Sequence, residues 1–199
     1  METAKDSGKR ILLILLKSFI VHTATILSKE LKMSRWGVWK ILKKLEEDKL
    51  ILLNQIGEGK TSTYGIKLNW DNIMTEKTLV LYLTQDALRY KRWRYDFEIL
   101  EKKVEFLILY GSILYSLKEA NDIDILGIAK KNKIRGINDL IFEIQKIQNK
   151  KIHSINLTNE ELKQELKRKN KAFVDAIERG IVLFGQEKFV NFMRKIHEN

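Results

Sequence analysis

The sequence contains no cysteine and only three histidines among its 199 residues. Without cysteine the chain has neither a disulfide framework nor a thiolate metal site. The histidines, His22, His153 and His197, show no metal-ligand spacing. These absences exclude a disulfide-stabilised fold and any metal site built from cysteine thiolates.

Proline is also absent, so turns must be built from Gly, Asn and Asp. No hydrophobic run is long enough to span a bilayer, because the best candidate, residues 9–21, is interrupted by Lys17. That segment has a basic start, but no small-residue cleavage site follows it, which argues against a signal peptide. We therefore expect a cytoplasmic protein with no membrane partner.

Positive charge is what the sequence has in excess. Lysine and arginine number 37 against 26 aspartates and glutamates, which gives a net charge of +11. An anionic partner such as nucleic acid, phosphate or an acidic membrane surface is favoured, and the charge alone does not choose among them. Hydrophobic residues make up 44% of the chain, so each half can bury a core.

The first third of the chain predicts helices followed by a hairpin. The helices are expected over residues 8–22, 24–32 and 35–48. Ser34 is a favourable N-cap for the third helix, in which Val38, Leu42 and Leu45 form one core-facing stripe. Two strand-like runs within 50–68 then flank a Gly-Glu-Gly-Lys turn, which is typical of a β-hairpin.

This order of elements, with the stretch HTATILSKELKMSRWGVWKILKKLEEDKLI, resembles the winged helix-turn-helix family over residues 8–68. The resemblance implies double-stranded DNA as a partner, with the third helix in the major groove. The residues expected at the DNA are Ser34, Arg35, Trp36, Trp39, Lys40 and Lys43 of the helix and Lys60 and Thr61 of the wing. Arg35 would read guanine and the lysines would hold phosphates. The two tryptophans could instead bury against the long helix expected over 75–103 or against a second subunit.

Residues 75–103 predict one long helix that links the two halves of the chain. The expected domains are 1–70, a linker over 71–103, and 104–199. Within the helix the stretch RYKRWRY, 89–95, alternates basic and aromatic residues. It is either a nucleic-acid contact, with arginine on phosphate and rings on bases, or a solvated face with Tyr90 and Trp93 packed on a neighbouring domain.

After residue 104 the pattern alternates strand and helix, which predicts a small mixed-sheet domain and an overall α/β (α+β) fold class. Strands are expected over 104–111, 122–129 and 151–158, and helices over 112–119, 135–150 and most of the remainder to 197.

The first two of these strands carry the residues that suggest chemistry. Gly111 and Ser112 end the first strand, where a glycine lets backbone N–H groups approach a phosphate. Asp122 and Asp124 occupy alternate positions of the next strand, so they point to the same face. Paired carboxylates suit Mg²⁺, which bridges them to the phosphates of a nucleotide. The alternative is that both aspartates are solvent-facing or capping residues at the start of a strand.

The stretch GSILYSLKEANDIDIL resembles the G-S…D-x-D motif of the polymerase-beta nucleotidyltransferase superfamily, in its minimal archaeal form, and the resemblance extends over residues 104–197. It implies Gly111 and Ser112 at the phosphates of a nucleoside triphosphate. It also implies Asp122 and Asp124 as Mg²⁺ ligands and, in an active enzyme, as catalytic residues. The family's third acidic residue is missing, since the corresponding position on the next strand is about His153.

Taken together, the two resemblances predict a DNA-binding transcriptional regulator whose C-terminal domain binds a Mg²⁺-nucleotide without transferring it. We expect it to be a homodimer, with residues 75–100 as the contact. One alternative is an active nucleotidyltransferase that moves a nucleotide from NTP to a protein or RNA target. Another is an antitoxin-like partner of a second protein, with neither activity.

Overall fold

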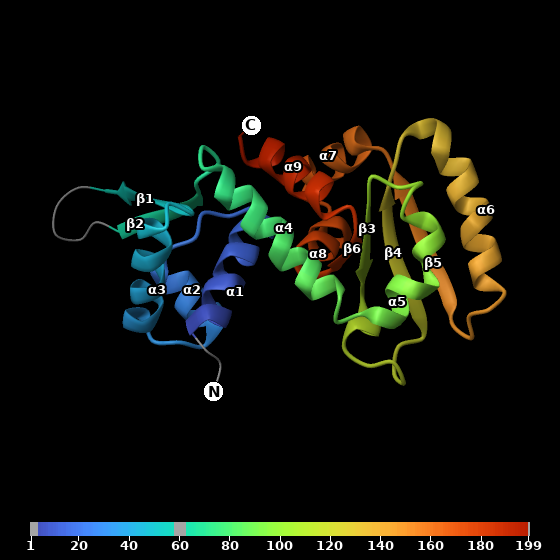
Figure 1. Ribbon diagram of the computed structural model, residues 1–199, viewed down its shortest axis with the longest axis horizontal. Helices are drawn as coiled ribbons and strands as arrows, with labels where there is room; N and C mark the ends of the chain where they lie inside the picture. The colour runs from blue at the N-terminus through green and yellow to red at the C-terminus, as the bar shows by residue number, and fades with distance from the viewer. Residues whose placement is uncertain (1–3, 58–62, 199) are drawn as a thin grey trace. The chain divides into compact units, whose positions relative to one another are not determined.

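The computed structural model describes residues 4–57 and 63–198. The chain divides into two compact units, Met1–Tyr82 and Leu83–Asn199, and the division lies inside one helix. In the described residues the fold is mixed α/β, with nine α-helices and two small sheets (Figure 1). None of the helices in this part of the chain is both long and apolar enough to cross a bilayer.

The first unit consists of three helices and a hairpin. They are α1 (Ala4–Lys17), α2 (Ala24–Leu31), α3 (Arg35–Glu47), β1 (Ile51–Ile56) and β2 (Thr63–Leu68), followed by the start of α4 (Ile73–Ala87). The Ser34 hydroxyl accepts a hydrogen bond from the Gly37 N–H at 3.1 Å, so the predicted N-cap of α3 is confirmed. Val38, Leu42 and Leu45 are buried, as their spacing predicts.

The first predicted helix is too long at its C-terminal end, since α1 ends at Lys17 rather than at residue 22. His22 instead forms an antiparallel bridge with Ile66 of β2, whose N–H donates to the His22 carbonyl at 2.9 Å. A residue that pairs with a sheet edge must have an extended backbone, and this tertiary contact overrides the helical pattern.

The single long helix predicted over 75–103 is also wrong. The structure has α4, then α5 (Lys91–Asp96) and the short 3-10 helix η2 (Glu98–Leu100). Leu83 and Ala87 of α4 are buried, and the next buried residue is Trp93, six positions further on. Six residues are about 1.7 helical turns, so an unbroken helix would aim Trp93 away from that face. The break lets Trp93, Phe97 and Leu100 enter the core of the second unit.

The second unit is built on a four-stranded sheet with the order β5-β4-β3-β6. Its strands are β3 (Phe106–Tyr110), β4 (Asp122–Ile128), β5 (Lys151–Leu157) and β6 (Ile181–Phe184). Strand β3 pairs antiparallel with β4 and β6, and β4 pairs parallel with β5. The helices of this unit are α6 (Ile134–Gln145), α7 (Asn159–Lys167), α8 (Lys171–Arg179) and α9 (Gln186–His197).

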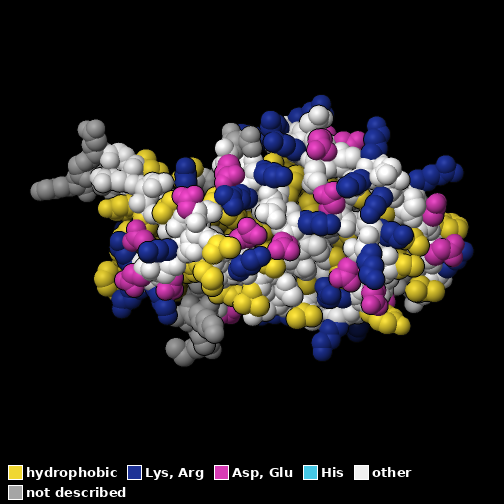
Figure 2. Space-filling model, turned by 45° about the horizontal axis from the view of Figure 1, so that its top comes forward, with side chains coloured by type: hydrophobic (Ala, Val, Ile, Leu, Met, Phe, Trp, Pro, Cys, Tyr) yellow, Lys and Arg dark blue, Asp and Glu magenta, His cyan; other side chains and the backbone are white. Residues whose placement is uncertain are grey.

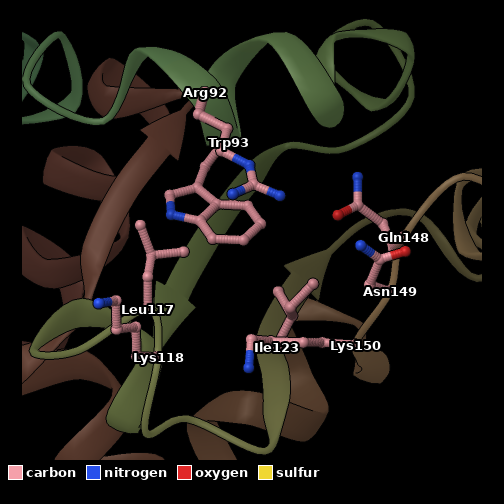
Figure 3. A pocket seen from close by; sticks show the side chains of 8 residues that line it. All are labelled: Arg92, Trp93, Leu117, Lys118, Ile123, Gln148, Asn149 and Lys150. Carbon is pink, nitrogen blue, oxygen red and sulfur yellow. The ribbon is translucent and has the colours of Figure 1, made fainter.

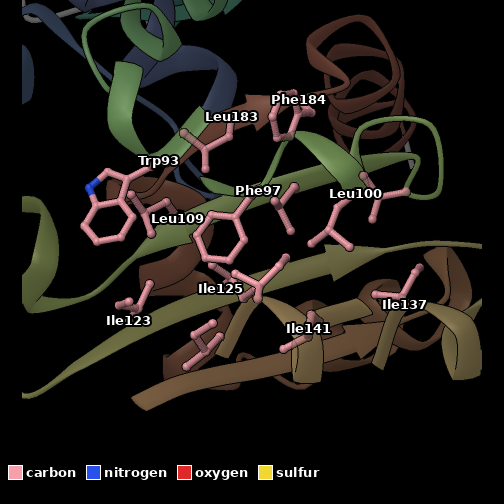
Figure 4. Packing of buried hydrophobic residues seen from close by; sticks show 14 of the residues in the cluster. Trp93, Phe97, Leu100, Leu109, Ile123, Ile125, Ile137, Ile141, Leu183 and Phe184 are labelled. Carbon is pink, nitrogen blue, oxygen red and sulfur yellow. The ribbon is translucent and has the colours of Figure 1, made fainter. Parts of the chain in front are cut away.

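Each face of this sheet has its own core. On one face Ile123 and Ile125 of β4 pack with Trp93 and Phe97 and with Ile137 of α6 (Figure 4). On the other face the Phe106 ring lies 5.4 Å from the Phe189 ring of α9, edge to face. Because successive strand residues point to opposite faces, the even-numbered residues of β3 and β4 lie on the α9 face.

Between β3 and β4 the predicted helix over 112–119 does not form. Only one 3-10 turn, η3 (Ser112–Leu114), is present, and the chain continues through turns to β4. Ile113 and Ala120 are buried, and the Lys150 ammonium donates to the Ala120 carbonyl. These contacts hold the connection against the sheet.

Candidate functional site

Asp122 and Asp124 share one face of the sheet because they alternate with buried residues of β4. Ile123 and Ile125 point into the core, where they are 1% and 0% exposed, so the two aspartates point to the opposite face. Both carboxyl groups remain partly exposed near the start of the strand. The predicted common orientation of the pair is confirmed, and neither residue is used as a helix cap in the described structure.

His153 joins the aspartates because β5 lies beside β4 in parallel register. Asp124 and His153 are direct partners across the two strands. His153 Nδ1 lies 3.1 Å from Asp122 Oδ2 and 3.6 Å from Asp124 Oδ1. One donor atom of each side chain lies within 4.8 Å of the others, which is a spacing that one metal ion can bridge.

Gly111 closes one side of this cluster. Its backbone has φ +80° and ψ −163°, a conformation that residues with a side chain avoid. A Cβ placed there would lie 2.3 Å from Asp124 Oδ2, so only glycine lets the carboxylate approach this turn. Ser112 follows as the first residue of η3 and is exposed. The structure therefore brings Gly111, Asp122 and Asp124 together, with Ser112 next to them.

The electrostatics of the cluster favour a bound cation. Burial raises the pKa of the Asp124 carboxyl and the Asp122 carboxylate raises it further, while His153 opposes the rise. Burial followed by Asp124 and Asp122 likewise raises the pKa of the Tyr110 hydroxyl. Two carboxylates in one half-buried place repel each other, and a divalent cation between them would remove that cost.

Tyr110 belongs to the same cluster, although sequence reasoning did not identify it. It is the last residue of β3 and the direct partner of Asp124 across the antiparallel pair. Tyr110, Asp124 and His153 thus form a row across three adjacent strands. The alternation of β3, read together with its pairing to the D-x-D strand, is the signal that would have revealed it.

The donor set fits a divalent cation. The carboxylate oxygens of Asp122 and Asp124 suit Mg²⁺ or Mn²⁺, and the imidazole of His153 suits a transition metal better than Mg²⁺. No carboxylate occupies the third position, because β5 reads KIHSINL. These residues therefore do not provide the three carboxylates that would hold a second metal ion.

Three of the residues predicted at the DNA are exposed on α3. Arg35, Trp36 and Lys40 are exposed, with Trp36 at 66%, and the Lys40 ammonium lies 5.4 Å from the centre of the Trp36 ring. Trp39 is half-buried and packs on Tyr64 of β2 at 5.5 Å. Trp36 is therefore available to a partner, whereas Trp39 mainly supports the hairpin.

The other residues predicted at the DNA have different surroundings. The Lys43 ammonium donates to Glu46 at 2.8 Å, and this hydrogen bond raises the pKa of Lys43. Its charge is thus partly compensated before any phosphate binds. The Ser34 hydroxyl already caps α3. Lys60 and Thr61 lie outside the described residues.

The basic and aromatic stretch 89–95 packs as the second interpretation predicts, with Tyr90 and Trp93 on the core of the second unit. Trp93 is buried in the core, and Arg94 donates to the Leu183 carbonyl, so both residues are structural. Arg89, Lys91 and Arg92 are exposed. The rings of Tyr90 and Trp93 thus pack on the core, while these three basic side chains face the solvent; contact with a nucleic acid stays a prediction.

The large net charge does not by itself mark a site. Figure 2 shows lysine and arginine side chains scattered over the visible face among acidic ones.

Searches of the chain against protein-family models, curated proteins and solved structures find no match. Function must therefore be inferred from the local arrangement of the chain's own residues.

Proposed function

We propose that this chain is a DNA-binding transcriptional regulator with an N-terminal winged helix-turn-helix and a C-terminal nucleotidyltransferase-like domain that binds a divalent cation with a nucleoside triphosphate. The observation that carries the proposal is the exposed basic face of α3. It presents Arg35, Trp36 and Lys40 at the start of a helix that is capped at Ser34 and followed by a two-stranded hairpin.

The chemistry of that face suits a major groove. Arg35 can donate two hydrogen bonds to guanine, and Lys40 can neutralise a phosphate. Burial of Val38 and Leu42 fixes which side of α3 faces outward, so these side chains are oriented before DNA arrives. Recognition then needs little rearrangement of the helix, which lowers the ordering cost of binding.

In the C-terminal domain Asp122 and Asp124 would hold the cation, and Gly111 and Ser112 would lie at the phosphates. The cation would supply charge neutralisation for the triphosphate. His153 occupies the place where an enzyme of this type would carry its third carboxylate, and an imidazole is a poor ligand for Mg²⁺. This substitution favours nucleotide binding without transfer.

The second candidate is an active nucleotidyltransferase acting on a protein or RNA. It is favoured by the close approach of Gly111 to Asp124 and by the common face of the two aspartates. Incubation with each labelled NTP and Mg²⁺ or Mn²⁺ separates the two candidates. If the wild type incorporates the label and Asp122→Asn/Asp124→Asn does not, the protein is an enzyme. That result would overturn the proposal of a regulator that binds the nucleotide without transferring it.

The nucleotide site is tested by calorimetric titration with Mn²⁺ and Mg²⁺, each with and without a non-hydrolysable NTP. We expect the wild type to bind a cation and Asp122→Asn/Asp124→Asn to bind it at least tenfold more weakly, because two charge-assisted ligands are lost. DNA binding by the winged helix-turn-helix is tested separately, by selecting the DNA duplexes that the protein binds from a random pool. If no duplex is enriched, the regulator proposal fails, whatever the titration shows.

A homodimer fits the symmetry of most operators, which offer two half-sites. We propose that α4 supplies the contact. Met74 and Leu81 of α4 are exposed, and they lie seven residues apart. Side chains at this spacing form one stripe along a helix, and a second copy of the same stripe is a suitable cover.

A further inference from the structure

A second hollow region lies in the same unit as the candidate site. One cavity of about 170 Å³ is lined by residues of α5, of the connection before β4 and of the turn before β5 (Figure 3). Another, of about 320 Å³, is lined by residues 89–93 and by η3 and the residues after it. Both are lined by Arg92, Trp93 and Leu117, so they adjoin each other. We call the pair the α5 groove.

The lining of the α5 groove is strongly basic. Its basic side chains are Arg89, Lys91, Arg92, Lys118 and Lys150, and no lining residue in either cavity carries a carboxylate. Asp86 lies 3.9 Å from Arg89, and Asp96 lies 3.5 Å from Arg92. Both pairs are loose and their arginines are well exposed, so an incoming phosphate can compete with the aspartates.

Aromatic rings stand among these charges. The Arg92 guanidinium lies 4.9 Å from the centre of the Trp93 ring, and Figure 3 shows the two side chains together at the mouth of the smaller cavity. Tyr90 and Tyr115 line the larger cavity, and Tyr115 is 76% exposed. The Tyr115 phenol is close enough to contribute to the raised pKa of Tyr90, behind burial and Asp86. An exposed ring among cations is the arrangement that stacks an unpaired base.

We infer that the α5 groove binds a single-stranded polynucleotide, with phosphates on Arg89, Lys91 and Arg92 and a base stacked on Tyr115. A small anion would need the cations but would not use the exposed ring. A duplex keeps its bases stacked inside and cannot present one to Tyr115. An acidic peptide would satisfy the charges, but it offers few flat rings for stacking.

One short segment of the chain connects the α5 groove with the candidate site. Ser112 lies beside the aspartate cluster, and the next residues, Ile113 to Tyr115, line the groove. Ile123, which lines the groove, points to the opposite face of the sheet from Asp122 and Asp124, so a polynucleotide bound in the groove would lie across the sheet from the aspartates. Binding of a single-stranded polynucleotide in the groove goes beyond the proposed function. It needs neither the cation at Asp122 and Asp124 nor the winged helix-turn-helix.

The experiment measures the anisotropy of a labelled oligonucleotide of about 12 nucleotides, with RNA and DNA versions, in buffer with EDTA. The full chain is compared with Tyr115→Ala and Arg89→Gln. Tyr95→Ala is the matched ring control, since Tyr95 is 79% exposed on α5 outside the groove. Arg168→Gln is the matched charge control. Arg89 and Arg168 are 70% and 72% exposed, and each has an acidic partner three residues before it.

We expect Tyr115→Ala to weaken binding about tenfold or more with an unchanged salt dependence, because only stacking is lost. Arg89→Gln should lower the slope of log affinity against log salt by about 0.7, as expected for one lost phosphate contact on a single strand. Tyr95→Ala and Arg168→Gln should bind as the wild type does. Binding of either RNA or DNA supports the inference, and a preference identifies the sugar.

Three results would overturn the inference. The first is an affinity of Tyr115→Ala for the oligonucleotide that equals that of the wild type. The second is a loss of affinity in the control variants as large as in Tyr115→Ala and Arg89→Gln. The third is a loss of single-strand binding in Arg35→Ala/Lys40→Ala, which alters only the helix α3. Asp122→Asn/Asp124→Asn should leave this binding intact in EDTA. A failure of the metal site is thereby distinguished from a failure of the groove.

Discussion

Gly111 and Asp124 approach each other so closely that a Cβ on Gly111 would lie 2.3 Å from Asp124 Oδ2. The contact joins the turn after β3 to a strand residue thirteen positions later, and it depends on the positive φ of Gly111. Any side chain at residue 111 would strain the backbone and push the Asp124 carboxylate away from its neighbours.

Gly111→Ala should therefore lower the free energy of unfolding by about 2 kcal/mol and weaken cation binding at least tenfold. Urea titration and calorimetry measure the two effects. Gly136→Ala is the matched control, because Gly136 lies in α6 with no atom within 4 Å of an added Cβ. It should leave cation binding unchanged and raise stability by about 0.5 kcal/mol. Equal behaviour of the two variants would contradict the role given to Gly111.

Arg35→Ala/Lys40→Ala should weaken binding to the selected duplex about 100-fold, since each charge-assisted contact contributes on the order of 1–3 kcal/mol. The salt dependence should become shallower as well, because a phosphate contact is lost. Arg168→Gln, far along the chain, serves as the control. Unchanged duplex affinity in the double variant would show that α3 is not the reading helix.

His22 should make the protein less stable in acid. Its ring is 2% exposed, neither ring nitrogen has a hydrogen-bond partner among the described residues, and burial lowers the pKa of His22 in spite of Glu30. The contribution of the neutral, buried His22 ring to the free energy of unfolding is therefore fully present above the unfolded-state pKa of about 6.5. As the pH falls below it, only the unfolded chain takes up the proton, so stability falls by up to about 1.4 kcal/mol per pH unit until the lowered folded pKa is reached.

Urea midpoints at pH 7.5 and pH 5.5 (about one unit on either side of the unfolded pKa) measure this loss. His22→Leu should reduce the difference between the two midpoints, and His197→Gln, which alters an exposed histidine, should not. A wild-type difference that persists in His22→Leu would assign the pH dependence to other groups.

Leu81→Lys should shift the proposed homodimer towards monomer, because it places a charge in the exposed stripe of α4. Sedimentation equilibrium over a range of concentrations measures the shift. Ile147→Lys is a suitable control, since Ile147 is exposed in the turns after α6. A wild type that stays monomeric at every concentration would remove the dimer from the proposal.

Several elements followed from local sequence alone. Ser34 and the Val38, Leu42 and Leu45 stripe set the start and the inner face of α3, because capping and helical periodicity are local effects. The alternation in β4 likewise put Asp122 and Asp124 on one face. The hairpin strands were also predicted, whereas Lys60 and Thr61 of its turn lie outside the described residues.

Other features were decided by the tertiary structure. The break after α4 follows from the need to bury Trp93, Phe97 and Leu100, and nothing in the local propensity of 75–103 announces it. The end of α1 follows from the pairing of His22 with Ile66. Neither the break nor the end of α1 can be deduced from helical periodicity, because each depends on contacts between residues that are far apart in the sequence.

The candidate site shows the same division. The sequence by itself determined the glycine turn and the aspartate pair, since a strand's period of two is a property of its own backbone. Only the pairing of β4 with β3 and β5 placed Tyr110 and His153 beside those carboxylates. Sheet order is set by which packing buries the most apolar surface across the whole unit, and that quantity belongs to the folded chain rather than to any segment of it.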